Sequence, residues 1–160
     1  MEAIARTQSK RQSATAVLKP EAFISQEIEL MLHPPHGAGT ISYIRGLLTG
    51  HSIEILASSP YAEGRSQQWL VVVHDGERAA AVLREAGMEC VTESVLLIEA
   101  PLRSSACAIL GTTLMGQGIG IQYTYSTAGD SRMTTVFKTT DGCRAFNLLA
   151  GVPRAAHTAN

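Results

Sequence analysis

The sequence predicts an α+β protein built from two tandem copies of one β-α-β-β-α unit. The pentad Asp-Gly-x-Arg-Ala occurs at residues 75–79 and again 66 residues later, at residues 141–145. So many matches in a single register indicate a repeated supersecondary unit. The same offset aligns further residues of one type: Leu48 with Leu114, Gly50 with Gly116, Ile53 with Ile119, and Ile55 with Ile121.

Hydrophobic periodicity and turn residues give the order of elements in the first copy. Apolar and polar residues alternate in the first strand, and aliphatic residues recur at helical spacing in the segment that follows. We predict a strand at residues 28–32, a loop at 33–39, a helix with Thr40 as its N-cap and Gly50 as its end, a strand at 53–58, a turn at 59–66, a strand at 67–74, and a helix capped by Asp75 and closed by Gly87.

A long β segment at residues 90–100 both ends the first copy and begins the second. The order then repeats: a loop at 101–105, a helix that ends near Gly116, a hairpin of strands 121–127 and 133–139, and a helix from Asp141 to Gly151. With a fourth strand after the first copy, this is the split βαβ, ferredoxin-like order. We expect antiparallel sheets with the helices on one face.

The repeat also predicts how the chain divides. We expect an N-terminal extension at residues 1–23, subdomains at 24–94 and 95–152, and a tail at 153–160. A unit of about 66 residues buries only about 60% of its unfolded surface, so the copies should share an interface. The second copy lacks a convincing fourth strand. Residues 14–18, or a second copy of the chain, are the candidates to supply it.

Composition excludes several classes of function. The net charge is −1 and no basic stripe lies outside the N-terminal segment, which argues against nucleic-acid binding. No apolar run approaches the roughly 18 residues of a membrane span. The three cysteines form no CxxC pair, which fits a reducing compartment and a cytoplasmic protein. The N-terminal segment lacks the apolar core of a secretory signal. A partly ordered extension is favoured there over a transit peptide.

No motif in the chain predicts catalysis, a cofactor or a metal. His33 and His36 lie three residues apart in a loop, but a closed metal site needs about four ligands and none lies nearby in sequence. The run Gly-Gln-Gly-Ile-Gly at residues 116–120 follows a helix and precedes a strand, whereas a dinucleotide site needs the reverse order. The repeated Arg78 and Arg144 are interpreted as solvated or capping residues.

Residues 25–151 resemble the tandem ACT-domain proteins. The ACT pattern is a strand, a loop ending in glycine at a helix start, and about fourteen residues later an Ile-Asn-Ile-like strand. Here Gly39 precedes Ile-Glu-Ile at residues 53–55, and Ser105 precedes Ile-Gly-Ile at residues 119–121. The segment Leu-Arg-Glu-Ala-Gly-Met-Glu-Cys at residues 83–90 is similar to the end of the second ACT helix.

The resemblance implies two ferredoxin-like (βαββαβ) ACT-type subdomains that bind a small molecule, most often an amino acid, where ACT units meet. A glycine at the loop lets the backbone approach a ligand, and the free N–H groups of the helix favour a carboxylate. The residues expected at the site are His36, Gly37, Ala38, Gly39, Thr40, Glu54, Ser104, Ser105, Ile119, Gly120, Ile121 and Gln122.

Two function classes follow from this comparison. Gly39 favours an amino-acid-binding regulatory module without catalysis. The usual Asn is Glu54 in one copy and Gly120 in the other, and Ser105 replaces the loop glycine of the second copy. These departures favour a structural or oligomerisation module that has lost its ligand. In either class we expect a homodimer that carries four ACT-like units.

Overall fold

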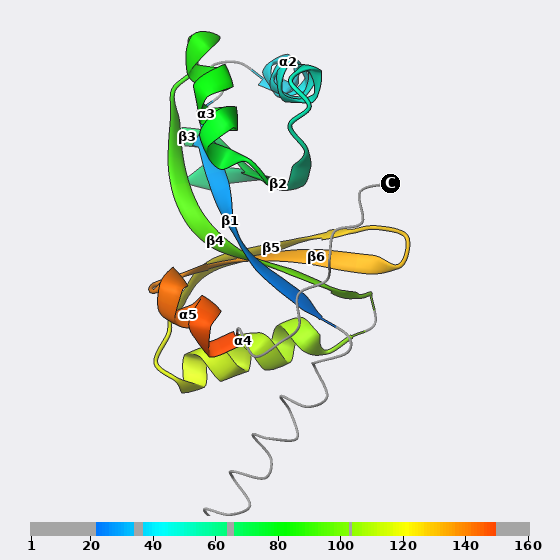
Figure 1. Cartoon of the computed structure of the whole chain (residues 1–160), viewed down its shortest axis with the longest axis vertical. Helices are drawn as coiled ribbons and strands as arrows, with labels where there is room; N and C mark the ends of the chain where they lie inside the picture. Colours follow the sequence, from blue (N-terminus) through cyan, green and yellow to red (C-terminus); the bar gives the residue numbers. More distant parts are fainter. Residues whose placement is uncertain (1–21, 34–36, 64–65, 103, 150–160) are drawn as a thin grey trace, which may run out of the picture. The chain divides into compact units, whose positions relative to one another are not determined.

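The computed structural model describes residues 22–33, 37–63, 66–102 and 104–149, with antiparallel strands and helices in an α+β arrangement (Figure 1). Contacts divide the chain into two compact units. The first unit is Gln26–Val95, and the second unit combines the residues before Gln26 with those from Leu96 onward. The boundary therefore passes through two long strands, β1 (Phe23–Leu32) and β4 (Cys90–Pro101).

The first unit contains α2 (Gly37–Gly50), β2 (Ile55–Glu63), β3 (Ser66–Val73) and α3 (Gly76–Glu85). Its strand order is β2-β3-β1-β4, and β3 pairs antiparallel with both β2 and β1. Alternate residues of β1 and β3 face the two helices, so α2 and α3 cover one sheet face. The buried cluster they enclose includes Leu30, Leu32, Ile44, Leu48, Trp69, Val71, Val73, Val82 and Leu83.

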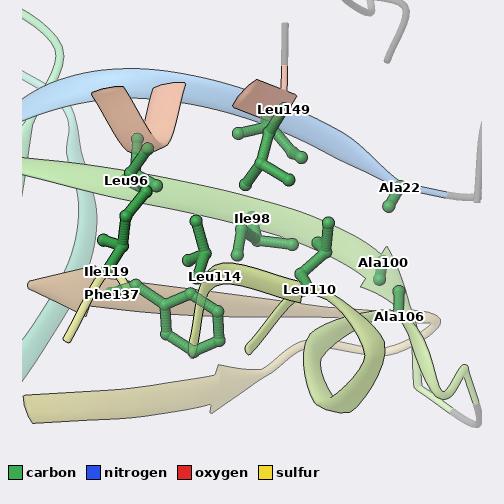
Figure 2. Close-up of a cluster of buried hydrophobic side chains, with 12 residues drawn as sticks. Ala22, Leu96, Ile98, Ala100, Ala106, Leu110, Leu114, Ile119, Phe137 and Leu149 are labelled. Atoms are coloured by element: carbon green, nitrogen blue, oxygen red, sulfur yellow. The ribbon is translucent and has the colours of Figure 1, made fainter. Parts of the chain in front are cut away.

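The second unit contains α4 (Ala106–Gly116), β5 (Ile121–Ala128), β6 (Arg132–Thr139) and α5 (Gly142–Leu149). Its strand order is β1-β4-β6-β5, and β6 pairs antiparallel with both β4 and β5. Leucines of α4 and α5 meet the inward residues of β4 and β6, as Figure 2 shows. This cluster includes Ala22, Ile24, Leu96, Ile98, Leu110, Leu114, Ile119, Phe137 and Leu149.

The repeated pentad is a helix-start motif. Asp75 Oδ1 accepts a hydrogen bond from the Arg78 backbone N–H at 3.2 Å, and Asp141 Oδ1 accepts from that of Arg144 at 2.9 Å. Both caps that the sequence predicted are confirmed. The alanine that ends the pentad is fully buried in each copy, at Ala79 and Ala145.

The glycine of the first pentad has a packing reason. A Cβ on Gly76 would lie 2.3 Å from the Cβ of Ile28, so the start of α3 packs directly against β1. Such a separation is far inside van der Waals contact, and any larger residue would force the helix and the strand apart.

The two helices that precede β2 and β5, α2 and α4, also end alike. Ser52 and Gly118 both have positive φ, at 56° and 74°. The next residue then donates back into the helix, from Ile53 N to Leu48 O at 2.9 Å and from Ile119 N to Leu114 O at 3.0 Å. The glycine run after α4 is therefore a helix end, which agrees with rejecting it as a dinucleotide motif.

Three element boundaries differ from the sequence prediction by more than two residues. α2 begins at Gly37, so Thr40 lies inside its first turn and is not its N-cap. β2 continues to Glu63 where a turn was expected. Pro60 lies inside β2 opposite Trp69. Prolines within sheets are largely confined to edge strands, and β2 is at the end of the strand order.

The third difference concerns β1, which begins at Phe23 and not at Ile28. Its first residues belong to the second unit, where β1 neighbours β4 and Ile24 packs into the core. The start of β1 thus takes the fourth-strand position for which residues 14–18 or a second chain were the candidates. Residues 14–18 themselves lie outside the described part of the chain.

We predict that Gly76→Ala destabilises the protein by about 1–3 kcal/mol, because the added methyl group overpacks the contact with Ile28. The matched control is Gly46→Ala in α2, where an added Cβ meets nothing within 4 Å. That change should raise stability by about 0.5–1 kcal/mol. Urea unfolding followed by circular dichroism measures both. Equal stability of the two variants would contradict the assigned contact.

Candidate functional site

Four segment ends meet at one edge of the first unit. α2 starts soon after the end of β1, and α3 runs from the far end of β3 back to the start of β4. β3 is antiparallel to β1, so the end of α3 lies at the same edge as the end of β1. This edge therefore contains the predicted ligand loop together with the turn between α3 and β4.

Of the predicted residues of the first unit, those at the start of α2 lie at this edge. Glu54 instead precedes the start of β2, where Ile55 pairs with Val73 at the opposite edge. Residues 37–40 make the first turn of α2, which contains no acidic residue. Gly39 is exposed, and a Cβ there would meet nothing within 4 Å. Glu54 is exposed between Ile53 and β2. His36 lies outside the described residues.

The predicted residues of the second unit serve mostly structural roles. Ser104 Oγ accepts a hydrogen bond from the Ala106 N–H at 3.0 Å, whereas the Ser105 side chain makes no capping bond. Ser104 therefore caps the start of α4. The loop before α4, which lacks the glycine of the ACT pattern, thus has a capping role.

The strand segment at residues 119–122 offers little side-chain surface to a ligand. Ile119 is a core residue, 1% exposed, and Ile121 is half-buried. Gly120 N donates to Thr140 Oγ1 at 3.0 Å, and a Cβ there would lie 3.0 Å from Thr140 Cγ2. Of these four residues only Gln122 is exposed. This group and residues 37–40 belong to different units.

A hollow that the sequence analysis did not identify lies at the same edge of the first unit. Its volume is about 570 Å³. The end of β1, the last turn of α3 and the start of β4 supply its lining residues: His33, Arg84, Gly87, Met88, Glu89, Cys90 and Val91. Five of the lining residues belong to the segment at residues 83–90, which resembles the end of an ACT helix. That resemblance gave no reason to single out its two charged lining residues, Arg84 and Glu89.

The end of α3 gives the hollow its shape. Gly87 has a φ of 78°, which favours glycine. Its N–H donates to Arg84 O at 2.9 Å, and Met88 N–H donates to Leu83 O at 2.9 Å. This tight reversal brings the last turn of α3 and the first residues of β4 to the same hollow.

Two of the lining residues, His33 and Cys90, have resolved surroundings: His33 is exposed and Cys90 is half-buried. Gln68 Nε2 lies 3.1 Å from His33 Nε2. Burial raises the pKa of the Cys90 thiol, and the nearby Arg84 guanidinium acts in the opposite direction. Within the described residues no three His, Cys, Asp or Glu side chains form a group that could hold a metal ion.

Solved structures of similar fold include regulatory subunits and domains of aspartate kinases. The regulatory subunit of aspartate kinase from Thermus thermophilus, in its ligand-free form, matches with a TM-score of 0.56 at 14% identity, over 82% of this chain and 96% of that one. A Bacteroides thetaiotaomicron protein, BT0572, matches with a TM-score of 0.64 at 18% identity, over 81% and 89% of the two chains. The chain has the fold of the regulatory ACT-domain subunits.

This ACT-type fold is the one that the sequence resemblance indicated. A third match is a protein from Porphyromonas gingivalis that is described as a putative C-terminal regulatory domain of aspartate kinase. Its TM-score is 0.50 at 9% identity, over 81% of this chain and 94% of that one. No protein-family profile and no curated protein sequence matches the chain. Several of these neighbours are described as regulatory subunits or domains. No helix among the described residues is long and apolar enough to cross a membrane.

We predict that Arg84→Gln raises the pKa of the Cys90 thiol further, because it removes the cation that favours the thiolate. The thiolate is the nucleophile, so alkylation of Cys90 should slow and its pH profile should move to higher pH. Alkylation rates from pH 7 to 10 measure this. Arg78→Gln, at the opposite end of α3, is the control and should leave the profile unchanged. Identical profiles for the two variants would refute the coupling.

Proposed function

We propose that the chain is a regulatory module that binds an amino acid and carries out no catalysis. In this proposal it consists of two tandem ferredoxin-like ACT-type units, with a ligand held where ACT units meet. The carrying observation is the fold likeness to regulatory subunits of aspartate kinases over more than four-fifths of the chain, 82% for the Thermus thermophilus subunit. The strand orders of the two units and their matching helix ends support the tandem interpretation.

The first turn of α2 supports this ligand site best. Helix N-termini present backbone N–H groups that favour an anion, and no acidic side chain in this turn opposes a carboxylate. Open space around Gly39 leaves room for close approach of a ligand. In the proposal this turn holds the carboxylate, and a strand segment equivalent to residues 119–122 of another unit covers the rest of the ligand.

A structural module without a ligand is the second candidate. The residues that favour it are Ser104, which serves as a helix cap, and Gly120, whose N–H is already bonded to Thr140. These two positions argue against an equivalent site at the start of α4. They leave the start of α2 as the better candidate in this chain.

We predict that at least one amino acid raises the melting temperature. A ligand at 100 times its Kd stabilises the native state by about 2.7 kcal/mol, which for a protein of this size corresponds to several degrees. A thermal-shift screen of the standard amino acids, repeated by calorimetry at millimolar concentration, measures it. A flat screen would favour the structural module.

Gly39→Val should abolish binding of such an amino acid at the α2 site and leave the protein folded. The branched side chain fills the space that a ligand needs, and nothing within 4 Å of the new Cβ would clash. Gly46→Val is the control, since it places the same residue in an open position of the same helix. Calorimetric titration of both variants compares the affinities. Loss of binding in Gly46→Val alone would argue against the site.

In solution we expect a cytoplasmic homodimer with four ACT-like units. β2 and β5 are the outer strands of the described sheet orders, and outer strands need to be covered or paired. Light scattering should give twice the mass of the 17.0 kDa chain. Deleting residues 1–21, and so sparing β1, tests whether the extension contributes. A monomeric full-length protein would disprove the dimer.

A further inference from the structure

The hollow at the end of α3 is large enough for a small metabolite. Its volume of about 570 Å³ falls within the range of roughly 300–1,000 Å³ that is usual for ligand pockets. All seven lining residues belong to the first unit. None of them is among the ligand-site residues that the ACT resemblance implied.

Arg84 and Glu89 give the hollow one positive and one negative charge. Within the described residues, neither side chain forms an ion pair with another protein group. The two opposite charges line one hollow but do not pair with each other. Each is therefore available to bind a charged group of a ligand. An arginine fork binds a carboxylate through two parallel hydrogen bonds.

The groups around Arg84 and Glu89 indicate which charged group of a ligand each would bind. The end of a helix carries partial negative charge on its carbonyl groups and favours a cation, so an ammonium is stabilised beside Glu89 at the end of α3. His33 lines the same hollow, and an imidazole ring can donate a hydrogen bond to a carboxylate. Met88 and Val91 add apolar lining for the remainder of a ligand.

We propose that this hollow binds a free α-amino acid inside the first unit, with its carboxylate on Arg84 and its ammonium on Glu89. The ligand class rests on the proposed function, but the site is separate from the first turn of α2 and needs no second unit. A simple anion would use only Arg84, and a simple cation would use only Glu89. A zwitterion of small size satisfies both.

Binding at this site has a direct chemical readout, because Cys90 lines the hollow and is half-buried. A bound amino acid should shield its thiol from a neutral alkylating reagent such as N-ethylmaleimide. Trypsin separates the three cysteines into peptides 85–103, 104–132 and 139–144, so mass spectrometry follows each one in the unaltered full-length chain. Cys143 is exposed and in the second unit, and serves as the internal control.

The experiment screens the standard amino acids singly for protection of Cys90 and for a thermal shift. The best of them is then compared with its N-acetyl and methyl-ester forms, each of which lacks one of the two charges. We expect protection of Cys90 by the free amino acid alone. Arg84→Gln and Glu89→Gln should each weaken binding about 10- to 100-fold, the usual effect of removing a hydrogen bond to a charged group.

Matched controls are available at the other end of the same helix. Arg78→Gln and Glu77→Gln remove the same charges from the first turn of α3, outside the hollow, and should leave affinity unchanged. Gly39→Val should leave Cys90 protection intact if the hollow is the binding site.

The outcomes separate this inference from the proposed function. A thermal shift that Gly39→Val abolishes, without protection of Cys90 and without effect of Arg84→Gln, overturns the inference and supports the α2 site. Protection by the N-acetyl or methyl-ester form equal to that by the free amino acid overturns zwitterion recognition. With neither a thermal shift nor protection for any amino acid, both proposals fail.

Discussion

The structure depends on two strands that each serve two hydrophobic cores. β1 places Ile24 in the core of the second unit and Leu30 in that of the first. β4 does the reverse, with Cys90 against the first core and Leu96 in the second. A register slip of one residue in either strand would turn its inward residues outward in both cores at once. This double constraint fixes the strand order of each unit and the positions of the loops at its edges.

The sequence predicted most of the fold because its signals are local. Asp75 and Asp141 cap helices, Gly87 ends one, and the alternation of β4 is visible in a single segment. The start of β1 was not predictable in the same way. Its Ile24 is buried by residues 96–149, so the reason for its extended conformation lies more than 70 positions away in the chain. The small residues at 37–39 look like a loop in sequence, although two glycines there begin a helix.

The candidate site was less predictable than the fold, and the cause is physical. Pattern matching finds residues that fill a position in a known scheme, and two of those found here, Ile119 and Ser104, instead pack the core and cap a helix. Arg84 and Glu89 are ordinary exposed charges in sequence. They become candidate binding residues because Gly87, which lies between them with a positive φ, reverses the chain. Both side chains then line one hollow. A turn of this kind determines where a charged side chain lies in space, but the sequence pattern around that residue does not reveal it.

The division of β1 and β4 between two cores has a consequence for biosynthesis. Residues that complete the first unit are contiguous, so this unit has all its contacts once Val95 has left the ribosome. The second unit must wait, because Ile24 is made well before its core partners Leu110 and Leu149. Closing so long a loop is slow compared with local folding. Translation therefore favours an order in which the first unit folds while the early strand residues stay unburied, a state in which exposed apolar surface invites chaperones or misassembly.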